Sequence, residues 1–415
     1  MTDRPLRFCL VTTFYPPYNF GGDGIAVQRL ATALANHGHH VEVVHCVDAF
    51  NAGRTAGHVS SDTYTDHPGI IHHALRSRVG LLSTLLTQQT SHPVLKRPAL
   101  KRILAHGAFD VVHFHNISLI GLTALGYSDA LTLYTMHEHW LVCPMHVLWK
   151  FNREPCSSRQ CLRCQLQGGR PPQLWRYTRL LEREIRRVDT FIAPSEFTRT
   201  KHRELGFPED IPIAHIPNFL PHPLPIPAHD TSPHAKPYFL YVGRLERIKG
   251  VHVALAAFMR YRKADLLIAG TGSEEAELHA FAADQPHIRF LGHTPYEQLQ
   301  GLMRHALAVV VPSVGYEVFP TTVLEANAQG TPVIGHRFGP LPEMLDGRGG
   351  MTYATEDELV EALERFRTDR DYRDALGRTG REEYLAKWTP ERHLDQYLSH
   401  IAALHQENRS FVSHS

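Results

Sequence analysis

The chain has 415 residues, of which 43% are hydrophobic and 20% charged, so it is long enough for two or three domains with their own cores. This composition excludes a disordered chain, and the 29 Gly and 28 Pro exclude collagen-like and low-complexity classes. The 43 Lys and Arg nearly balance the 42 Asp and Glu, which argues against a protein that binds nucleic acid by neutralising its phosphates.

The sequence shows none of the features of an exported or membrane-spanning protein. Its first residues, MTDRPLRFCLV, contain no apolar stretch of the length found in signal peptides. The longest apolar runs, such as residues 306–312, are far too short to cross a bilayer. We therefore expect a cytoplasmic protein. Most of its 30 His are scattered along the chain and are interpreted as surface residues.

The first half of the chain alternates between short apolar runs and amphipathic stretches. Apolar runs of this kind are typical of buried parallel strands. A glycine-rich turn at 21–24 separates the first run from a helix that Gly38 ends, and Ser195 with Glu196 is typical of a helix start. The predicted strands are residues 6–13, 41–46, 110–115, 131–136 and 189–193. The alternation predicts a parallel sheet with helices on both faces.

A proline-rich segment at residues 221–237 interrupts the alternation and is interpreted as a linker or surface loop. The alternation then resumes, with predicted strands at 238–242, 265–269, 287–291, 307–312 and 332–334 and helices at 251–260, 274–283, 322–329, 356–367, 371–387 and 390–405. We therefore predict an α/β fold of two Rossmann-like, doubly wound domains. Ligands bind such sheets outside the C-terminal ends of the strands, and two such edges that face each other would form one deep cleft.

Two loops of the second half carry features of an anion site. Gly243 and Arg244 directly follow a predicted strand, and Lys249 precedes a predicted helix. A guanidinium, an ammonium and a helix N-terminus together favour phosphate binding. Gly270 and Gly272 follow the next strand, where the absence of a side chain lets backbone approach a ligand closely. The alternative is a pair of surface cations beside ordinary turn glycines.

Two carboxylates follow a later strand. Glu317 lies in the predicted loop, and Glu325 lies one turn into the following helix. So placed, both can face a ligand whose phosphate sits at the helix N-terminus. The alternative is one capping carboxylate and one solvated carboxylate.

Together these residues resemble a known family. GRLxxxKG, GTG and E-x7-E within GYEVFPTTVLEANAQGTPVI, in this order and spacing, are similar to the second domain of retaining GT-B glycosyltransferases of family 4. The resemblance covers nearly the whole chain. It implies an acceptor-side Rossmann-like domain at 1–217 with a four-cysteine insertion near 141–169, a nucleotide-sugar domain at 218–387 that begins at a hinge, and a C-terminal helix at 388–415 that packs back on the first domain.

The resemblance also implies the donor contacts. Arg244 and Lys249 would hold the donor diphosphate, Glu325 the ribose hydroxyls and Glu317 the hydroxyls of the donor sugar. Other donor-binding positions implied by the family are Gly22, Gly243, Gly270, Gly272, His293 beside the base, and the backbone of Phe319, Pro320, Thr321 and Thr322. The chain has Val318 and Pro320 where the commonest motif is E-G-F-G, and Pro320 has no N–H to donate. The donor sugar is therefore left open, and so is the base: UDP is favoured, with GDP and ADP as alternatives.

In the first domain, His137 resembles the family's histidine at a strand end, with Glu138 in place of the usual Asp. The family role implies that His137 and Glu317 take part in catalysis by contacting the donor hexose, and that Arg244 and Lys249 do so by stabilising the charge on the leaving diphosphate. His113 and His115 end a neighbouring strand and are candidates to line the acceptor side. Taken alone, each of these histidines could instead be structural.

The implied reaction moves a sugar from a nucleotide diphosphate to an acceptor hydroxyl with retention of the anomeric configuration. No pair of carboxylates is placed as in glycosidases, and the likeness implies front-face attack without a catalytic metal. The acceptor could be a glycan, a lipid-linked compound or a small molecule. The alternatives are a nucleotide-sugar epimerase, a phosphorylase, or a non-catalytic interaction protein with the same fold. The sequence does not indicate an oligomeric state.

Four of the six cysteines lie close together. Cys143, Cys156, Cys161 and Cys164 have the spacing C-x12-C-x4-C-x2-C, which favours a structural zinc site in a cytosolic chain. Reduced thiols, a redox pair and an iron–sulfur cluster remain alternatives. Cys9 and Cys46 lie in predicted strands and are expected to be inert core residues.

A basic stretch also carries interleaved leucines. Its residues are Arg76, Arg78, Lys96, Arg97, Lys101 and Arg102 with Leu81, Leu82, Leu85 and Leu86. Such a stretch could rest on an anionic membrane, at its inner face, and reach a lipid-linked acceptor. The alternative is an ordinary solvated helix face.

Overall fold

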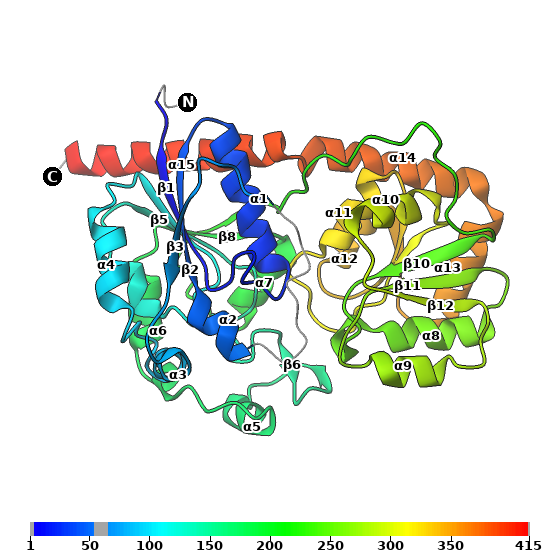
Figure 1. The fold of residues 1–415 in the computed structure, drawn as a ribbon, viewed down its shortest axis with the longest axis horizontal. Helices are drawn as coiled ribbons and strands as arrows, with labels where there is room; N and C mark the ends of the chain where they lie inside the picture. The colour runs from blue at the N-terminus through cyan, green and yellow to red at the C-terminus, as the bar shows by residue number, and fades with distance from the viewer. Residues whose placement is uncertain (1–3, 54–64, 414–415) are drawn as a thin grey trace. The chain divides into compact units, whose positions relative to one another are not determined.

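The computed structural model describes residues 4–53 and 65–413. These residues form two compact units (Figure 1). The described parts of Met1–His146, Gln160–Asn218 and His393–Ser415 make up the first unit, and Val147–Arg159 with Phe219–Arg392 make up the second. Each unit contains one parallel sheet and its own core, so the predicted α/β fold is confirmed.

The first unit is built on a seven-stranded parallel sheet with the order β3-β2-β1-β4-β5-β8-β9. Its strands are β1 (Arg7–Val11), β2 (His40–Cys46), β3 (Ile71–Leu75), β4 (Val111–Phe114), β5 (Leu131–Thr135), β8 (Thr190–Ala193) and β9 (Ile213–His215). In the central strand β1, Phe8 is aligned with Val41 of β2 on one side and Val111 of β4 on the other. The central strands are buried because helices cover both faces, which explains their continuous apolar runs.

The helices of the first unit are α1 (Gly22–Asn36), α2 (Val47–Gly53), α3 (Gly80–Thr90), α4 (Arg97–His106), α5 (Cys161–Gln167), α6 (Leu180–Ile185) and α7 (Glu196–Glu204), with the 3-10 turns η1 (Leu122–Gly126) and η2 (Leu174–Tyr177). Ser195 caps α7, since its side chain accepts a hydrogen bond from the amide of Thr198. The long helix α15 (Pro390–Ser413) lies beside β1 (Figure 1). The ring of Tyr397 packs near Phe8 of β1, and its hydroxyl is hydrogen-bonded to His113 of β4.

The second unit has a six-stranded parallel sheet with the order β12-β11-β10-β13-β14-β15. The strands are β10 (Tyr238–Val242), β11 (Asp265–Ala269), β12 (Ile288–Gly292), β13 (Val309–Val311), β14 (Val333–His336) and β15 (Gly350–Tyr353). The helices are α8 (Val251–Arg260), α9 (Glu275–Phe281), α10 (Tyr296–His305), α11 (Thr321–Ala328), α12 (Leu341–Leu345), α13 (Glu356–Thr368) and α14 (Arg370–Lys387), with a 3-10 turn η3 (Arg247–Lys249) before α8. A two-stranded ribbon, β6 (Trp149–Lys150) with β7 (Glu154–Pro155), also belongs to this unit.

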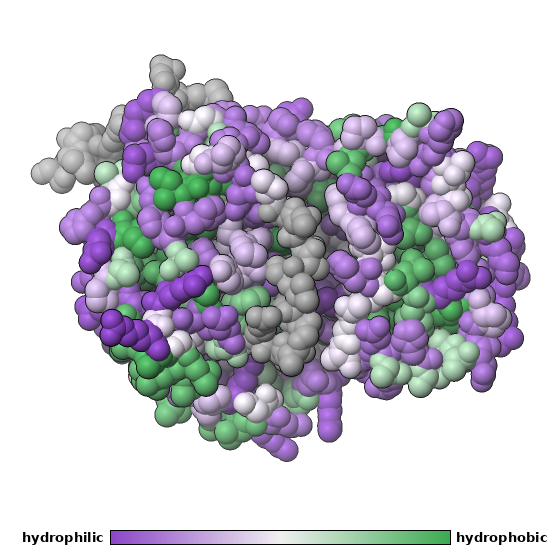
Figure 2. Space-filling model, viewed as in Figure 1, coloured by the Kyte–Doolittle hydropathy of each residue, from purple (hydrophilic) through white to green (hydrophobic). Residues whose placement is uncertain are grey.

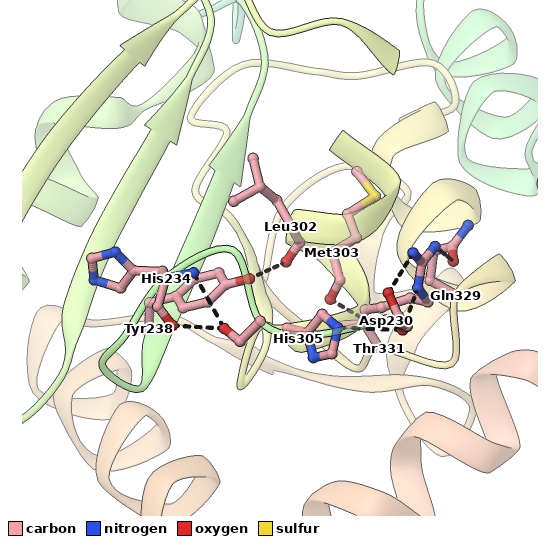
Figure 3. A network of polar contacts seen from close by, with 10 residues as sticks. Asp230, His234, Tyr238, Leu302, Met303, His305, Gln329 and Thr331 are labelled. Atoms are coloured by element: carbon pink, nitrogen blue, oxygen red, sulfur yellow. Dashed lines mark hydrogen bonds and ion pairs between the residues drawn. The ribbon is translucent and has the colours of Figure 1, made fainter. Parts of the chain in front are cut away.

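The proline-rich segment 221–237 runs without helix or strand, as expected for a loop, but it is tied to the second unit (Figure 3). Asp230 accepts two hydrogen bonds from Arg304 at 2.8 and 3.1 Å and lies 3.3 Å from His305 at the end of α10. Arg304 also donates to the side chain of Gln329 at 3.1 Å. The Arg304 guanidinium holds the pKa of the Asp230 carboxyl below its usual range, so the pair is charged at neutral pH. The segment therefore packs on the C-terminal end of α10, and Arg304 joins that end of α10 to the end of α11.

Candidate active site

The loops that follow β10 and β11 pack directly against each other. The amide of Gly243 donates to the Ala269 carbonyl at 3.0 Å, and Gly270 has a φ of +147°. A Cβ on Gly270 would lie 1.9 Å from the Gly243 carbonyl oxygen, and one on Gly272 would lie 2.3 Å from the Leu245 carbonyl oxygen. These glycines are therefore required by the contact between the two loops, whether or not a ligand also approaches them.

The two predicted cations lie in the loop between β10 and α8 but have different partners. Arg244 is more than half exposed, and its guanidinium contacts Glu246 at 2.7 Å. Lys249 ends the 3-10 turn η3 and is largely buried, and its ammonium contacts Glu317 at 2.6 Å. Gly250 follows in a left-handed conformation, φ +71°, and a Cβ there would lie 1.9 Å from the Pro312 carbonyl oxygen. The structure thus brings Lys249, and not Arg244, against the first predicted carboxylate.

Glu317 is held from two sides through one oxygen. Its Oε1 accepts a hydrogen bond from Lys249 at 2.6 Å and another from the Ser313 hydroxyl at 2.8 Å. Burial acts to raise the pKa of this carboxyl, but the charge and hydrogen bond of Lys249 outweigh burial and hold the pKa below its ordinary value. Within the described residues, Oε2 makes no hydrogen bond that would orient it elsewhere. Glu317 is therefore an oriented carboxylate at neutral pH.

The remaining donor-side residues surround the start of α11 and the end of β12. Pro320 directly precedes α11, and Thr321 and Thr322 form its first turn, while the half-buried Glu325 is one turn further along. The ring of Phe319 packs edge-on against Trp388 at 6.3 Å, so this side chain belongs to the core. His293 is exposed in the loop after β12, next to Gly292 with its φ of +66°.

In the first unit the structure groups histidines from β4 and β5 with helix α15. His115 Nδ1 lies 2.9 Å from His137 Nε2. His113 is bonded on both ring nitrogens, to the Tyr397 hydroxyl and to the Thr135 hydroxyl, each at 2.8 Å. Burial lowers the pKa of His137 to about 4 and the pKa values of His113 and His115 well below their ordinary range. All three rings are therefore neutral at pH 7.

The hydrogen bonds indicate which tautomer His137 adopts. His115 Nε2 is buried and has no partner among the described residues. Because a buried N–H without an acceptor is rarer than an under-satisfied acceptor, we assign the His115 proton to Nδ1, from which it is donated to His137 Nε2. His137 must then carry its own proton on Nδ1. The pair presents His137 Nδ1–H as a hydrogen-bond donor.

Gly22 is the first residue of α1, and a Cβ at this position would meet no atom of the described residues within 4 Å. The neighbouring Asp23 accepts a hydrogen bond from Asn116, which follows β4, at 3.0 Å. This contact joins the N-terminus of α1 to the carboxyl edge of the sheet. The space in front of Gly22 fits a backbone position that a ligand could approach.

Three residues of these arrangements were missed from the sequence. Ser313 orients Glu317, Tyr397 holds His113, and Asn116 holds the start of α1. Ser313 could have been found, since it directly follows a predicted strand four residues before Glu317. Tyr397 carries no such signal because its partner lies 284 residues away in the chain.

Two family models match the chain. The model described as "Glycosyltransferase Family 4" matches residues 20–222, and the model described as "Glycosyl transferases group 1" matches residues 226–383. A glycogen synthase of Mycobacterium tuberculosis (strain ATCC 25618 / H37Rv) is 30% identical over 369 residues, which cover 85% of this chain and 83% of the relative. The chain belongs to family 4 of the GT-B glycosyltransferases. It is a glycosyltransferase enzyme.

A further relative and two solved structures are also similar to most of this chain. A D-inositol 3-phosphate glycosyltransferase of Arthrobacter sp. (strain FB24) is 26% identical over 387 residues, which cover 86% of this chain and 84% of the relative. Among solved structures, sucrose-phosphate synthase from Thermosynechococcus elongatus superposes with a TM-score of 0.70 at 21% identity, covering 99% of this chain and 100% of that chain. Anabaena HepE, solved with UDP and glucose, has a TM-score of 0.67 at 16% identity and covers 96% and 100%. These structures show the shared GT-B fold.

The predicted zinc site is not supported. Among residues 4–53 and 65–413, no three His, Cys, Asp or Glu side chains are grouped so that they could hold a metal ion. Cys161 and Cys164 lie on α5 of the first unit, whereas Cys156 belongs to the second unit and its Sγ donates to the Ser158 carbonyl at 3.6 Å.

The cation beside these thiols is a guanidinium. Arg176 packs over the rings of Trp140 and Trp175 and donates to the Trp140 carbonyl at 2.7 Å. Burial lowers the pKa of Arg176 to about 10, and the nearby Cys143 and Cys161 act in the opposite direction. A half-buried positive charge at this place opposes a divalent metal ion by like-charge repulsion.

The residues of the predicted basic stretch do not all lie on one exposed surface. Lys96 is buried, where its ammonium lies 3.3 Å from Asp48 and donates to Ser83 at 2.7 Å, so it is a core residue. Arg76 donates to the Tyr18 hydroxyl at 2.9 Å. None of the described helices is long and apolar enough to cross a membrane.

Replacing Gly270 by alanine is expected to lower the free energy of unfolding of the second unit by about 2 kcal/mol or more, because Cβ would collide with the Gly243 carbonyl and the φ of +147° is unfavourable for alanine. Gly22→Ala is the matched control, since its Cβ would meet none of the residues that the structure describes, and it should change stability by less than about 1 kcal/mol. Urea unfolding of both variants measures this difference. Equal stability of the two variants would contradict the packing role of Gly270.

Acidification is expected to destabilise the first unit through its buried neutral histidines. Their pKa values lie below the ordinary value of about 6.5, so the unfolded chain takes up protons that the folded chain does not. Each such histidine then removes about 1.4 kcal/mol per pH unit below pH ~6.5 until its folded pKa near 4 is reached.

The slope of melting temperature against pH between 7.5 and 5 measures this effect. Replacing the buried His202, whose pKa burial lowers to about 4, by Gln should make the slope shallower. The same change at the exposed His40 should leave the slope as it is. Parallel slopes in all three proteins would show that the buried histidines do not control acid stability.

Proposed function

We propose that this glycosyltransferase is a retaining enzyme that moves a hexose from a nucleoside diphosphate donor to an acceptor hydroxyl. The observation that carries the proposal is the Lys249–Glu317 pair, oriented by Ser313 at the carboxyl edge of the second sheet. An ammonium next to a fixed carboxylate matches a ligand that has a phosphate beside sugar hydroxyls. We assign donor binding to the second unit and the acceptor side to the first.

The donor diphosphate is proposed to bind Lys249 and Arg244. Arg244 is exposed enough to leave Glu246 for a phosphate, since an exposed ion pair contributes little. Lys249 is already fixed by Glu317, so it loses little side-chain entropy when a phosphate arrives. UDP is the favoured nucleotide, supported by the UDP and UDP-glucose complexes of Anabaena HepE, and GDP and ADP remain alternatives. Glu325 is proposed to bind the ribose.

Each unit holds one oriented group that fits a sugar hydroxyl. Glu317 is held through Oε1, which leaves Oε2 to accept a hydrogen bond from a sugar hydroxyl. His137 is held through Nε2, which leaves Nδ1–H to donate one. In both cases a neighbour fixes one atom of the side chain and the other atom is presented in a defined direction. This pre-organisation is what positioning of a reacting sugar requires.

In the proposed reaction the acceptor oxygen forms a bond to the anomeric carbon on the face from which the diphosphate departs. The bond between that carbon and the phosphate oxygen breaks, and the leaving phosphate accepts the proton of the acceptor hydroxyl. Arg244 and Lys249 stabilise the charge that develops on the leaving group. His137, neutral because burial lowers its pKa to about 4, orients the sugar without adding charge.

Nucleotide binding tests the donor site. A nucleotide at about a hundred times its dissociation constant adds roughly 2.7 kcal/mol, a rise of a few degrees in melting temperature. We expect UDP to produce this shift in the wild-type protein, and Lys249→Met to reduce it by about half, because a tenfold loss of affinity lowers the added stability by about 1.4 kcal/mol. Lys263→Met is the control, because Lys263 is ion-paired with Glu364 in the same unit but lies outside the site. No shift with UDP, GDP, ADP or dTDP would contradict a donor site here.

Transfer activity tests the role of Glu317. Glu317→Gln keeps the shape of the side chain but removes its charge, so we expect kcat to fall about a hundredfold or more, with nucleotide binding largely kept. Product analysis by NMR should show the donor's anomeric configuration in the product. Inversion of that configuration would exclude the retaining reaction, and conversion of the donor sugar without an acceptor would indicate an epimerase.

A further inference from the structure

Helix α3 has the reverse of the usual distribution of side chains. Its buried residues are polar, Ser83, Thr84 and Thr87. Its leucines point to the surface, and Leu81 is 72% exposed. A helix at the surface of a globular protein normally turns its apolar side toward the core. The outer side of α3 is therefore an apolar surface that no other element among the described residues covers.

Neighbouring elements of the first unit extend this surface. The carbonyl of Pro171 accepts hydrogen bonds from Gln88 of α3 and from Gln165 of α5, and Trp175 of η2 donates to the Gln88 carbonyl at 3.0 Å. These bonds hold α3, α5 and η2 together. Their exposed apolar side chains, which we name the leucine face, are Leu81, Leu82, Leu85, Leu162, Leu166, Leu174 and Tyr177.

The leucine face is visible as a surface feature. Figure 2 shows hydrophobic residues gathered over α3 at the lower left of the view. Leu174 is 63% exposed and Leu166 is 60% exposed. Single exposed leucines are common on protein surfaces, but a group of them on connected elements is not. An exposed apolar surface of this kind marks a site of interaction with a partner.

The charge around the leucine face indicates the partner. Residues 67–109 and 160–181, which carry the face, contain no Asp or Glu. Arg78, Arg170 and Arg179 are exposed in these two segments. Exposed leucines and arginines without carboxylates are complementary to a partner that has an apolar interior and a negatively charged surface. An anionic lipid bilayer has both properties.

We propose that the leucine face binds an anionic lipid bilayer, with its leucines and Tyr177 inserted among the lipids and Arg78, Arg170 and Arg179 at the headgroups. The contact is peripheral, because no described helix could span the membrane. The inference deepens the proposed function by placing the acceptor at a membrane. Binding is measured without donor or acceptor, so its failure and the failure of the transferase assignment remain distinguishable.

Vesicle co-sedimentation of the full chain tests the proposal. We expect the wild-type protein to bind vesicles of 30% phosphatidylglycerol in phosphatidylcholine at least tenfold more tightly than pure phosphatidylcholine vesicles, and this preference to weaken as salt is raised. The triple variant L81Q/L82Q/L85Q should lose at least tenfold in binding to the anionic vesicles. R78Q/R170Q/R179Q should lose at least tenfold too, since each basic residue near an anionic surface contributes about fivefold.

Control variants separate the leucine face from general surface effects. Leu385 and Arg378 are exposed on α14 of the second unit, and L385Q and R378Q should bind as the wild type does. All replaced side chains are exposed, so the melting temperatures should stay within a degree or two of the wild type. Equal binding of the wild type to both kinds of vesicle, no binding to either, or unchanged binding by the leucine triple variant would overturn the proposal. A wild-type dimer that the leucine triple variant abolishes would identify a second copy as the partner instead.

Discussion

The ion pair between Lys249 and Glu317 depends on how closely two loops of the second unit approach each other. Gly250 lets the loop before α8 lie against the Pro312 carbonyl, where a Cβ would come within 1.9 Å. The carbonyl of Ile248 then accepts hydrogen bonds from two amides of the loop after β13, at 3.0 and 3.1 Å. This backbone contact sets Lys249 and Glu317 opposite each other at 2.6 Å. The orientation of the proposed donor site is therefore built from backbone packing, and the charged pair completes it.

The histidines of the first unit are also oriented by fixed neighbours, but here the groups are neutral. His113 is fixed by hydroxyls from β5 and α15, and His115 holds one nitrogen of His137. Because burial keeps these rings uncharged, the arrangement can direct a hydrogen bond without placing a charge in the core. The same burial makes the first unit sensitive to acid. Orientation in the proposed site and stability against pH are thus two consequences of one set of contacts.

The sequence predicts buried parallel strands well because such strands are apolar without interruption. The strands β10 and β11 and the helix α8 have the predicted bounds. The sequence predicts α3 poorly because its leucines face outward and its Ser and Thr inward, which reverses the expected pattern. The strand β15 was missed since it has four residues and begins with glycine. Local patterns report burial, and they fail where a surface is apolar or a strand is very short.

The site residues also separate into those that the sequence predicts and those that it does not. Lys249 and Glu317 could both be predicted as site residues because each lies in a recognisable sequence motif, although they are 68 positions apart in the chain. The zinc site was predicted from cysteine spacing, yet spacing does not reveal Arg176, whose half-buried guanidinium lies near Cys143 and Cys161. Contacts between distant segments, such as Tyr397 with His113, leave no local pattern to detect. Residues with their own motif are predictable, and residues that act through a distant neighbour are not.

Calorimetric titration with the monophosphate and the diphosphate of one nucleoside tests the central claim most directly. If Lys249 holds the terminal phosphate, the wild-type protein binds UDP at least tenfold more tightly than UMP, a difference of about 1.4 kcal/mol, and Lys249→Met weakens this preference several-fold while its affinity for UMP is unchanged. A preference for the diphosphate that is as large in Lys249→Met as in the wild type would contradict the account. It would show that the ion pair with Glu317 is structural and that the donor phosphates are bound elsewhere.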